Sequence, residues 1–425
     1  MSNKQENITR LVAFEILYKI YNGKSFFDNI FEFYIVKYKL NQFQKNYIYN
    51  LVLTSLRHHI RCQKIIKKYS KKKVKLKSKL LLIVAITQIL FFKTPNYAVV
   101  NTTVNISKKI SGVNPSFINA ILRMIIDKLD SVKLIDTNFN DLPNWFKNEI
   151  KEWNTKNKTD FLKHISQKPS LHIVLKNKND LSKFLHLGIP TSQTSIFLQK
   201  YNEINKIPYY EKGIWWVQDF SAMLPIYLLK NLEKINIIDM CAAPGGKTLQ
   251  LLSKNANLDI YEKNKKRISD LRKNLTRCGY DKKIYIDDVL NINKKNHYDM
   301  AILDAPCSSV GTLRRNPEIL FRKNFPDISY FSKYQLELLK KASDLICVNG
   351  IILYMVCSFF KKETTDIVNY FLKKNKNFIL QKFVLTETNP LLFNKRGQLK
   401  IIPTMYKDDY YIDGFFASIL KKKSE

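Results

Sequence analysis

The second half of the chain consists of short apolar runs that alternate with amphipathic stretches. Apolar runs occur at residues 235–240, 258–261, 300–303 and 351–356, and a stretch with helical spacing follows each of them. Short buried strands that alternate with amphipathic helices are typical of a doubly wound α/β fold with a parallel sheet. We therefore expect a Rossmann-like domain over residues 209–425, with ligands bound beyond the carboxyl ends of its strands.

The first of these strands runs into a glycine turn. From Asp239 to Thr248 the sequence reads Asp-Met-Cys-Ala-Ala-Pro-Gly-Gly-Lys-Thr. Two glycines let the backbone approach a ligand, and the helix that follows offers free N–H groups. The ending Gly-Lys-Thr suggests a phosphate-binding P-loop, but that motif needs glycine at position 241, where this chain has cysteine. We interpret the loop as a cofactor-binding turn; a purely structural turn is the alternative.

Acidic residues follow the expected strand at 258–261 and a further expected strand that ends just before Asp287. Glu262 ends the second strand, 23 residues after Asp239. An acid at about this spacing can accept hydrogen bonds from ribose hydroxyls. Asp287 and Asp288 end the expected third strand, where an acid can bind an adenine amino group, and Asp288 is the better candidate of the two. A solvated loop carboxylate is the alternative interpretation for each acid.

Two cysteines follow two further strands. The sequence Asp-Ala-Pro-Cys-Ser-Ser begins at Asp304, and Cys357-Ser358 follows the run at 351–356. A free cysteine is more often a small buried hydrophobe than a reactive group. The positions of Cys307 and Cys357 at strand ends of one sheet instead indicate that both thiols face the ligand crevice.

The front part of the chain differs from the rest in pattern and in charge. Apolar residues recur at helical spacing over roughly 8–17, 43–68, 79–93 and 115–129. Residues 1–130 carry 23 basic and 6 acidic side chains, and no acidic residue occurs between Glu32 and Asp127. An acid-free domain is best interpreted as a surface that faces phosphates. A lysine bias of this kind is also what an AT-rich genome produces.

Other features exclude several classes of protein. Residues 133–208 mix a strand-like Leu171–Leu175 with a helix-like Asp180–Leu187, which predicts a small α+β module. The most apolar stretch, residues 80–92, is too short to span a bilayer, and the first seven residues lack the apolar segment of a signal peptide. The six cysteines show no zinc-binding spacing. We therefore expect a cytoplasmic protein without a metal or a membrane partner.

The motifs together resemble those of the RNA (cytosine-C5)-methyltransferase family. The glycine loop, the Asp-Ala-Pro-Cys-Ser motif and the second Cys-Ser carry the resemblance, and Val217–Ser221, Arg314–Pro317 and Asp413–Phe416 match as well. The helical front part, with Ile118–Arg123, resembles the NusB-like RNA-binding domain. This pairing of domains is similar to the family members that methylate bacterial 16S ribosomal RNA.

The resemblance implies an architecture and a cofactor. It implies an all-α NusB-like domain at 1–132, a small α+β module at 133–208, and a Rossmann-like S-adenosylmethionine methyltransferase domain at 209–425. Glu262 would contact the cofactor's ribose and Asp288 its adenine. The loop that would hold S-adenosylmethionine consists of Cys241, Ala242, Ala243, Pro244, Gly245, Gly246 and Lys247.

The resemblance also assigns the chemistry. Cytosine C5 is a poor nucleophile, but a thiolate that adds at C6 makes an enamine that can take a methyl group at C5. By position alone either Cys307 or Cys357 could add; in the family the second cysteine, here Cys357, is the nucleophile, and Cys307 helps to release the product. Asp304 would hold the base edge and the methyl-donor region. The implied partner is 16S ribosomal RNA, free or in an early small-subunit particle, and the implied enzyme is a monomer that flips the target cytosine out of its stem.

The sequence departs from the family pattern at a few positions. Phe359–Thr364 stands where the family usually has Pro-Glu-Glu-Asn, Val356 replaces the usual Thr, and Glu262 replaces the commoner Asp. Lys176 and its neighbours replace an Arg-x-Asn pattern. None of these changes removes a reacting atom. Two alternatives stay open: the same chemistry on tRNA, against which the NusB-like part argues, and an RNA-binding ribosome-assembly factor without catalysis.

Overall fold

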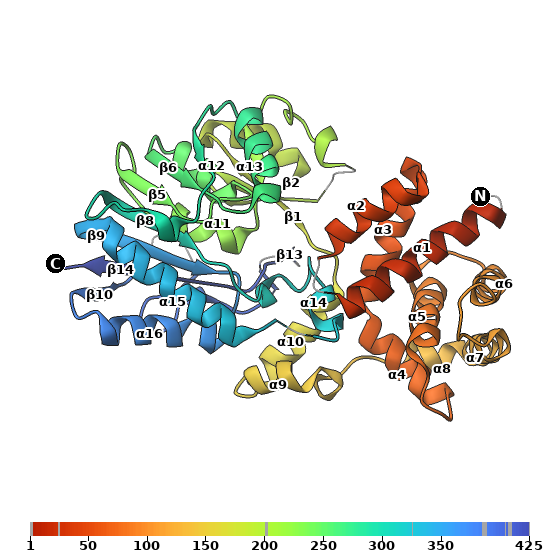
Figure 1. The fold of residues 1–425 in the computed structure, drawn as a ribbon. Helices are drawn as coiled ribbons and strands as arrows, with labels where there is room; N and C mark the ends of the chain where they lie inside the picture. Colours follow the sequence, from red (N-terminus) through yellow and green to blue (C-terminus); the bar gives the residue numbers. More distant parts are fainter. Residues whose placement is uncertain are drawn as a thin grey trace. The chain divides into compact units, whose positions relative to one another are not determined.

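The chain divides into two structural units (Figure 1). The computed structural model describes residues 3–23, 26–199, 203–324, 326–384, 389–403, 405–406 and 410–424. The first unit comprises Met1–Lys168 and Leu313–Pro326, and the second comprises Pro169–Thr312 and Asp327–Glu425. This is a different division from the three domains expected from the sequence, whose boundaries stay a prediction.

The first unit is helical, as predicted for a NusB-like domain. Its helices are α1 (Asn3–Asn22), α2 (Phe27–Tyr38), α3 (Gln42–Arg57), α4 (His59–Tyr69), α5 (Leu76–Phe91), α6 (Asn96–Ser107), α7 (Pro115–Asp127), α8 (Leu129–Lys133), α9 (Asn144–Glu149), α10 (Thr155–Ser166) and α14 (Glu318–Phe321). The helical spacing predicted over 43–68 is divided between two helices, because the backbone of His58 leaves the helical region (φ −104°, ψ 12°) and separates α3 from α4. Helix α7 begins at Pro115 as predicted, and the Asn114 side chain caps it.

Helix α5 forms the centre of the helical unit. Every residue from Leu80 to Gln88 is buried, polar ones included. A helix that is apolar all round must be covered on every side, and helices α1, α3, α4, α6 and α7 pack around it. This packing explains why residues 80–92 are the most apolar stretch of the sequence. Among the described residues, the structure contains no helix that is both long and apolar enough to cross a membrane.

A segment from the second half of the chain completes this helical core. Residues 313–326 lie in the first unit, although they follow the Cys307 motif by only a few residues. The Phe321 side chain is 3% exposed. Its ring centroid lies 5.7 Å from that of Tyr21 and 5.1 Å from that of His59. Phe321 is therefore a core residue of the helical unit.

Polar contacts fix the same segment. The Glu318 carboxylate accepts a hydrogen bond from the Phe27 backbone N–H at the start of α2 (3.1 Å), and the Lys323 N–H donates to the Tyr21 carbonyl (2.9 Å). The family-like Arg314–Pro317 motif thus belongs to the helical unit rather than to the sheet that precedes it in sequence. Nothing in the local sequence pattern indicated this placement.

The second unit is built on a mixed sheet with the strand order β10-β14-β9-β8-β5-β6-β7, and β11 pairs with β14. The strands are β5 (Asn236–Asp239), β6 (Asn257–Tyr261), β7 (Ile284–Tyr285), β8 (Tyr298–Asp304), β9 (Ile346–Val356), β10 (Phe378–Gln381), β11 (Leu399–Ile401) and β14 (Phe415–Lys422); a separate ribbon pairs β12 (Met405–Tyr406) with β13 (Tyr410–Tyr411). Strands β9, β8, β5, β6 and β7 are parallel, and β14 and β10 add antiparallel pairs at one edge. The four apolar runs of the sequence form β5, β6, β8 and β9, and the predicted Rossmann-like fold is confirmed.

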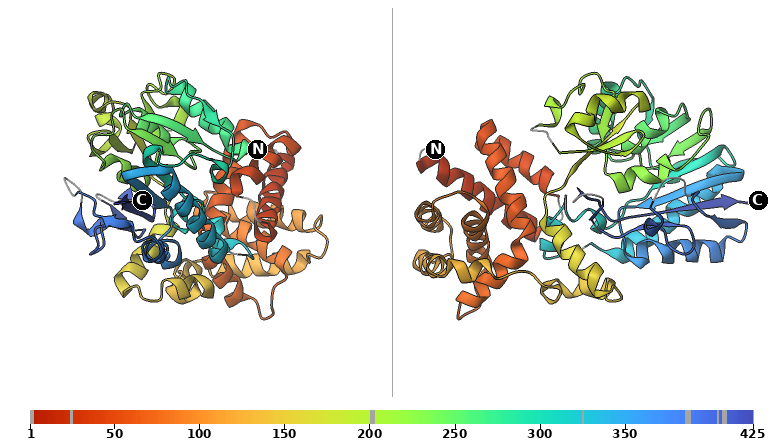
Figure 2. Two further views of the ribbon diagram at one scale, coloured as in Figure 1. Left: turned by 60° about the vertical axis from the view of Figure 1, so that its left-hand side comes forward. Right: turned by 180° about the vertical axis from the view of Figure 1, so that it is seen from behind.

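Helices cover both faces of this sheet (Figures 1 and 2). They are α11 (Phe220–Tyr227), α12 (Gly246–Leu252), α13 (Lys265–Arg277), α15 (Ile328–Leu345) and α16 (Thr365–Lys374). Ile237 packs in one core with residues of α11, α12 and α13, whereas its neighbour Ile238 packs in another core with residues of α15 and α16. Successive strand residues point to opposite faces, so both faces of β5 are buried.

A small antiparallel sheet precedes the large one in the same unit. Its order is β2-β3-β1-β4, formed by β1 (Leu171–Leu175), β2 (Gly188–Ser192), β3 (Ser195–Leu198) and β4 (Trp215–Val217). The predicted strand Leu171–Leu175 is confirmed, and the helix-like Asp180–Leu187 lies within the 3-10 helix η2 (Lys178–Leu187). Val174 and Phe197 of this sheet share a core with Phe220 of α11.

The strand order reverses at β5. This strand pairs with β6 on one side and with β8 on the other. Ligands of open α/β sheets bind beyond the carboxyl ends of the strands at such a reversal. The loops that follow β5, β6, β7, β8 and β9 all leave from this edge, and every predicted site residue of the chain lies in or next to one of them.

Candidate active site

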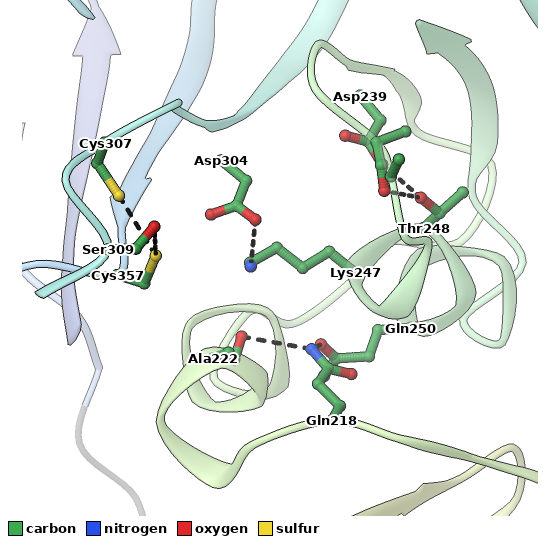
Figure 3. Close-up of polar contacts among 12 residues, drawn as sticks. Gln218, Ala222, Asp239, Lys247, Thr248, Gln250, Asp304, Cys307, Ser309 and Cys357 are labelled. Carbon is green, nitrogen blue, oxygen red and sulfur yellow. Dashed lines mark hydrogen bonds and ion pairs between the residues drawn. The ribbon is translucent and has the colours of Figure 1, made fainter. Parts of the chain in front are cut away.

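Neighbouring strands bring the two predicted cysteines together. The register pairs Asp304 of β8 with Met355 of β9, so the loops that follow these strands start side by side. Cys307 Sγ lies 3.3 Å from Cys357 Sγ (Figure 3). The Gly311 N–H donates to the Cys357 carbonyl (3.0 Å), which ties the two loops through their backbones. The thiols are therefore in direct contact, whereas the sequence predicted only that both face the same crevice.

The contact between the thiols makes their acidities unequal. Its hydrogen bond with Cys307 lowers the pKa of Cys357. The same hydrogen bond and burial raise the pKa of Cys307 well above its usual range. The Ser309 hydroxyl lies 3.6 Å from Cys357 Sγ. Because the thiolate is the nucleophilic form of cysteine, this arrangement favours Cys357 as nucleophile and a protonated Cys307 beside it.

The loop after β5 depends on glycine for its path. Gly245 has φ +106°, and a Cβ added there would come within 2.8 Å of Leu271 Cδ1. Only glycine adopts this conformation readily. At Gly246, the first residue of α12, a Cβ would lie 3.3 Å from the Gln218 side chain. The fold itself thus accounts for both glycines, and they leave the loop backbone without bulky side chains at the strand reversal.

A buried carboxyl group lies at the base of this loop. Asp239 at the end of β5 is 1% exposed, and its Oδ2 accepts a hydrogen bond from Thr248 Oγ1 at 2.7 Å. Burial raises the pKa of Asp239 to about 7. The carboxyl group therefore ties the two ends of the glycine loop together, and it keeps its proton to a higher pH than an exposed aspartate does.

Glu262 lies directly against the glycine loop. Its side chain is 5% exposed, Oε2 accepts a hydrogen bond from the Ala243 N–H (3.2 Å), and Oε1 accepts one from the Asn264 N–H (2.8 Å). The Arg267 guanidinium lies 3.8 Å from Oε2 and also donates to the Ala243 carbonyl. The carboxylate thus connects the end of β6 to the loop after β5. A carboxylate oxygen has two lone pairs, so these bonds leave acceptor capacity for a ligand.

Asp288 belongs to the same edge of the sheet. It caps the 3-10 turn η4 (Val289–Asn291), where its Oδ1 accepts from the Leu290 N–H at 3.1 Å. Its Oδ2 lies 2.9 Å from Lys263 Nζ, and Lys263 also bonds the Tyr334 hydroxyl of α15. Because Lys263 directly follows Glu262, this ion pair links the two predicted acids through one neighbouring side chain.

Asp304 and Lys247 connect the cysteines to the glycine loop. Lys247 Nζ lies 2.6 Å from Asp304 Oδ2 and 5.2 Å from the centre of the Phe415 ring. Figure 3 shows this pair between the two cysteines on one side and Asp239 with Thr248 on the other. The structure therefore assembles the residues predicted from separate motifs at one edge of the sheet.

The comparisons with known families agree with this geometry. Residues 226–421 match the model of a family described as 16S rRNA methyltransferase RsmB/F, and residues 7–127 match the NusB family model. The methyltransferase domain belongs to the RsmB/F family. A NusB domain precedes it, as the sequence predicted. The matched methyltransferase region contains the glycine loop and both cysteine motifs.

The match to curated relatives extends over most of the length of this chain. It is 28% identical over 368 residues to ribosomal RNA small subunit methyltransferase B of Photorhabdus laumondii, which covers 81% of this chain and 82% of the relative. It is 26% identical over 351 residues to the protein of the same name in Pasteurella multocida, with 77% and 78% covered. The similarity thus includes residues of both units.

Solved structures share the fold. The crystal structure of PH0851 superimposes with a TM-score of 0.74 at 19% identity and covers 98% of this chain and 99% of that chain. The structure of NSun6 from Pyrococcus horikoshii with SFG has a TM-score of 0.55 at 16% identity and covers 66% and 97%. The fold of this chain therefore has counterparts among known structures.

Gln218 lies beside the glycine loop but was not predicted from the sequence as a site residue. Its Nε2 donates to Gln250 Oε1 (2.7 Å), and its Oε1 accepts from the Trp216 indole N–H (2.8 Å). It also donates to the Ala222 carbonyl at 3.4 Å (Figure 3). The bonds join β4, α11 and α12 beside the glycine loop. The match of Val217–Ser221 to the family was the available signal.

The other missed residue is Glu363, which hydrogen-bonds Ser308 and Ser358, the residues that follow the two cysteines. In the part of the chain that the structure describes, no group of three or more His, Cys, Asp or Glu side chains is arranged to hold a metal ion.

Proposed function

We propose that this protein transfers the methyl group of S-adenosylmethionine to C5 of a cytosine in 16S ribosomal RNA. The observation that carries the proposal is the pair of thiols in contact at 3.3 Å, with the lower pKa on Cys357. The names of the curated relatives, ribosomal RNA small subunit methyltransferase B, support the substrate. The family model of the catalytic domain supports the same class of RNA.

The residues at the strand reversal suit an S-adenosylmethionine cofactor. The loop from Cys241 to Lys247 would hold it, because it leads from the end of β5 into α12 at the strand reversal, where such folds bind their ligands. Glu262 and Asp288 follow β6 and β7, at the positions where ribose and adenine bind in such folds. When bound, the cofactor supplies an electrophilic methyl group on a sulfonium.

Cys357 would begin the reaction. Its thiolate adds to C6 of the flipped cytosine, and the electrons of the C5–C6 double bond move into the ring. Asp304 would hold the base edge, where protonation at N3 accompanies the addition. C5 is then an enamine carbon and accepts the methyl group. The Lys247 ammonium, 2.6 Å from Asp304 Oδ2, keeps that side chain aimed at the space between the cysteines and the glycine loop.

Product release requires three bonds to break. C5 loses its proton and the C6–sulfur bond breaks, which restores the ring double bond and returns Cys357 as a thiolate, and N3 gives up the proton that it gained during the addition. Cys307 would assist this release, since its sulfur lies beside that of Cys357. A cytosine paired in a stem must leave its helix to enter this site.

The helical unit would bind the RNA backbone. It contains a hollow of about 1260 Å³ whose lining includes the apolar residues Ile60, Ile66 and Val74. Seven lysines also line it: Lys64, Lys67, Lys68, Lys71, Lys72, Lys73 and Lys79. Lysine contacts with phosphates release counterions and provide most of the affinity of non-specific binding. The further expectations of a monomer in the cytoplasm, acting on free RNA or an early small-subunit particle, stay predictions.

Methyl transfer to defined RNA tests the proposal. The full-length protein is incubated with labelled S-adenosylmethionine and small-subunit RNA, and bisulfite sequencing maps the product. A 5-methylcytosine in 16S RNA is expected. No methyl transfer to any RNA would favour the catalytically silent assembly factor, and transfer to tRNA alone would favour the tRNA alternative.

Two variants test the roles of the cysteines. Cys307→Ala should accumulate a covalent RNA–protein adduct, because release is impaired after addition. The double variant Cys307→Ala/Cys357→Ala should lose this adduct. An adduct that survives Cys357→Ala would mean that the two cysteines have the opposite roles.

A further inference from the structure

A buried carboxylate lies between the loops that carry the two cysteines. Glu363 ends the 3-10 turn η6 (Lys361–Glu363) and is fully buried. Its Oε1 accepts the Ser308 N–H at 2.7 Å, and its Oε2 accepts the Ser358 hydroxyl at 2.7 Å and also bonds the Ser308 hydroxyl. Ser308 directly follows Cys307, and Ser358 directly follows Cys357. One carboxylate thus bonds the residue next to each thiol.

The position of this carboxylate is itself fixed. The Tyr354 hydroxyl on β9 donates to the Glu363 carbonyl (2.7 Å) and lies 3.1 Å from Gln335 Oε1 on α15. Gln335 Nε2 donates to the Pro306 carbonyl (3.0 Å) and lies 3.4 Å from Glu363 Oε1. Tyr354 and Gln335 are completely buried. A network of this kind holds its members in one geometry, because breaking any of its bonds leaves a buried polar group unpaired.

The charges around the two thiols are arranged differently. The hydrogen bond with Cys357 and burial raise the pKa of Cys307 most, and the negative charges of Cys357 and of the nearby Glu363 carboxylate raise it further. The hydrogen bond with Cys307 lowers the pKa of Cys357. Burial and the Asp304 carboxylate oppose this effect, and the Ser309 hydroxyl and the Lys247 ammonium lower the pKa further. A negative charge on the Cys307 side favours retention of the proton there.

We propose that Glu363 is a positioning residue of the cysteine pair: it fixes the spacing of the two loops and keeps the proton on Cys307, so that Cys357 is the thiol that ionises. The consequence for catalysis rests on the proposed methyl transfer, whereas the consequence for thiol ionisation does not. Glu363 lies within the stretch that departs from the family pattern. The neighbouring Lys361 and Lys362 are exposed, and the carboxylate that contacts both loops is present.

Thiol alkylation across a range of pH tests this directly. The full-length protein, without RNA or cofactor, is treated with iodoacetamide, and mass spectrometry measures the rate at Cys307 and at Cys357 separately. In the wild type, Cys357 should react at lower pH than Cys307. In Glu363→Gln, which keeps the size of the side chain and removes its charge, the Cys357-to-Cys307 rate ratio near neutral pH should fall about tenfold, equivalent to one pKa unit. An unchanged ratio would overturn the proposal.

Two further variants separate charge from structure. Glu363→Asp keeps the charge, so its rate ratio should stay within about twofold of the wild type even though the shorter side chain loosens one bond. If the Asp variant also loses the ratio tenfold, the charge does not set the ratio, and the proposal that Glu363 keeps the proton on Cys307 fails. Should the Gln variant not fold, the Asp variant and Ser308→Ala test the proposal instead. Ser308→Ala removes the hydroxyl hydrogen bond to Glu363 on the Cys307 side and should lower the Cys357-to-Cys307 rate ratio. Glu337→Gln, an exposed position on α15, is the matched control.

The catalytic consequence has its own readout. In Glu363→Gln the turnover of methyl transfer should fall while the KM for RNA stays unchanged, because the thiol pair does not form the RNA-binding surface of the helical unit. A protein that shows the alkylation pattern and no methyl transfer would refute the proposed function and leave the ionisation inference standing. A rise in KM with unchanged turnover would contradict the positioning role.

Discussion

Asp239 should make the methyltransferase unit less stable as the pH rises. Its carboxyl group is 1% exposed, and burial raises its pKa to about 7, whereas an aspartate in an unfolded chain titrates near 4. A carboxyl group with a raised pKa binds its proton more tightly in the folded state. Its contribution to stability is therefore fully present below about pH 4 and is lost as the pH rises to about 7.

The magnitude follows from the size of this window. Between about pH 4 and pH 7 the folded state holds a proton that the unfolded state has released, so the free energy of unfolding falls by about 1.4 kcal/mol per pH unit. From pH 5 to pH 7 the loss amounts to about 2 kcal/mol, since the transition flattens near the folded pKa. Asp239→Asn cannot ionise and still offers an oxygen to the Thr248 hydroxyl, so it should remove this slope.

Urea unfolding at pH 5, 6, 7 and 8 measures the effect. Tryptophan fluorescence reports on the second unit alone if Trp145 and Trp153 of the helical unit are replaced by phenylalanine, because the buried Trp215 and Trp216 then provide the signal. The free energy of unfolding of the background protein should fall relative to that of Asp239→Asn as the pH rises, so that the Asn variant loses its disadvantage or becomes the more stable of the two.

An exposed aspartate provides the control for this measurement. Asp270→Asn, on the outer face of α13, should show the same pH dependence as the background protein. Parallel curves for the background and Asp239→Asn from pH 5 to pH 8 would refute the reasoning, because they would mean that the buried carboxyl group titrates like an ordinary one.

Two other predictions concern the helical unit. Replacing Lys71, Lys72 and Lys73 with glutamine should flatten the dependence of RNA binding on salt, by up to about 0.9 in the logarithmic slope for each phosphate that the protein no longer neutralises, in filter-binding titrations; an unchanged slope would mean that the lysine run is only solvated surface. Phe321→Ala should destabilise this unit by about 3–5 kcal/mol, because it opens a cavity in its core. Faster hydrogen exchange in α1 and α3 is the expected result, and faster exchange confined to the large sheet would contradict the placement of the segment.

Local sequence patterns predicted much of the catalytic unit. Strands β5, β6, β8 and β9 are apolar and are followed by helical spacing, so the local sequence of each one is enough to predict a buried strand. Because parallel neighbouring strands end at one edge, the sequence also predicted that Cys307 and Cys357 face the same crevice, and their sulfur atoms are 3.3 Å apart. The assignment of the nucleophile needed the family resemblance, since position alone treats the two thiols equally.

Other features depend on contacts that no local pattern encodes. Glu363 bonds Ser308 across 55 positions of sequence, and it lies in a stretch whose neighbours differ from the family. Phe321 looks like an ordinary apolar residue of the catalytic half, and only packing assigns it to the helical core. The raised pKa of Asp239 depends on how completely the glycine loop and α12 exclude water. Such properties arise from tertiary burial, which periodicity and spacing do not specify.

The segment at 313–326 has a consequence for how such a protein can be rearranged in evolution. The chain passes from one unit to the other after Lys168, after Thr312 and after Pro326, so no single breakpoint separates them. A gene fragment that encodes only the catalytic half would carry Ile319, Leu320 and Phe321, which are 1%, 7% and 3% exposed in the complete chain, without the helices that cover them. The two halves are therefore expected to be inherited, duplicated and lost together rather than exchanged as independent modules.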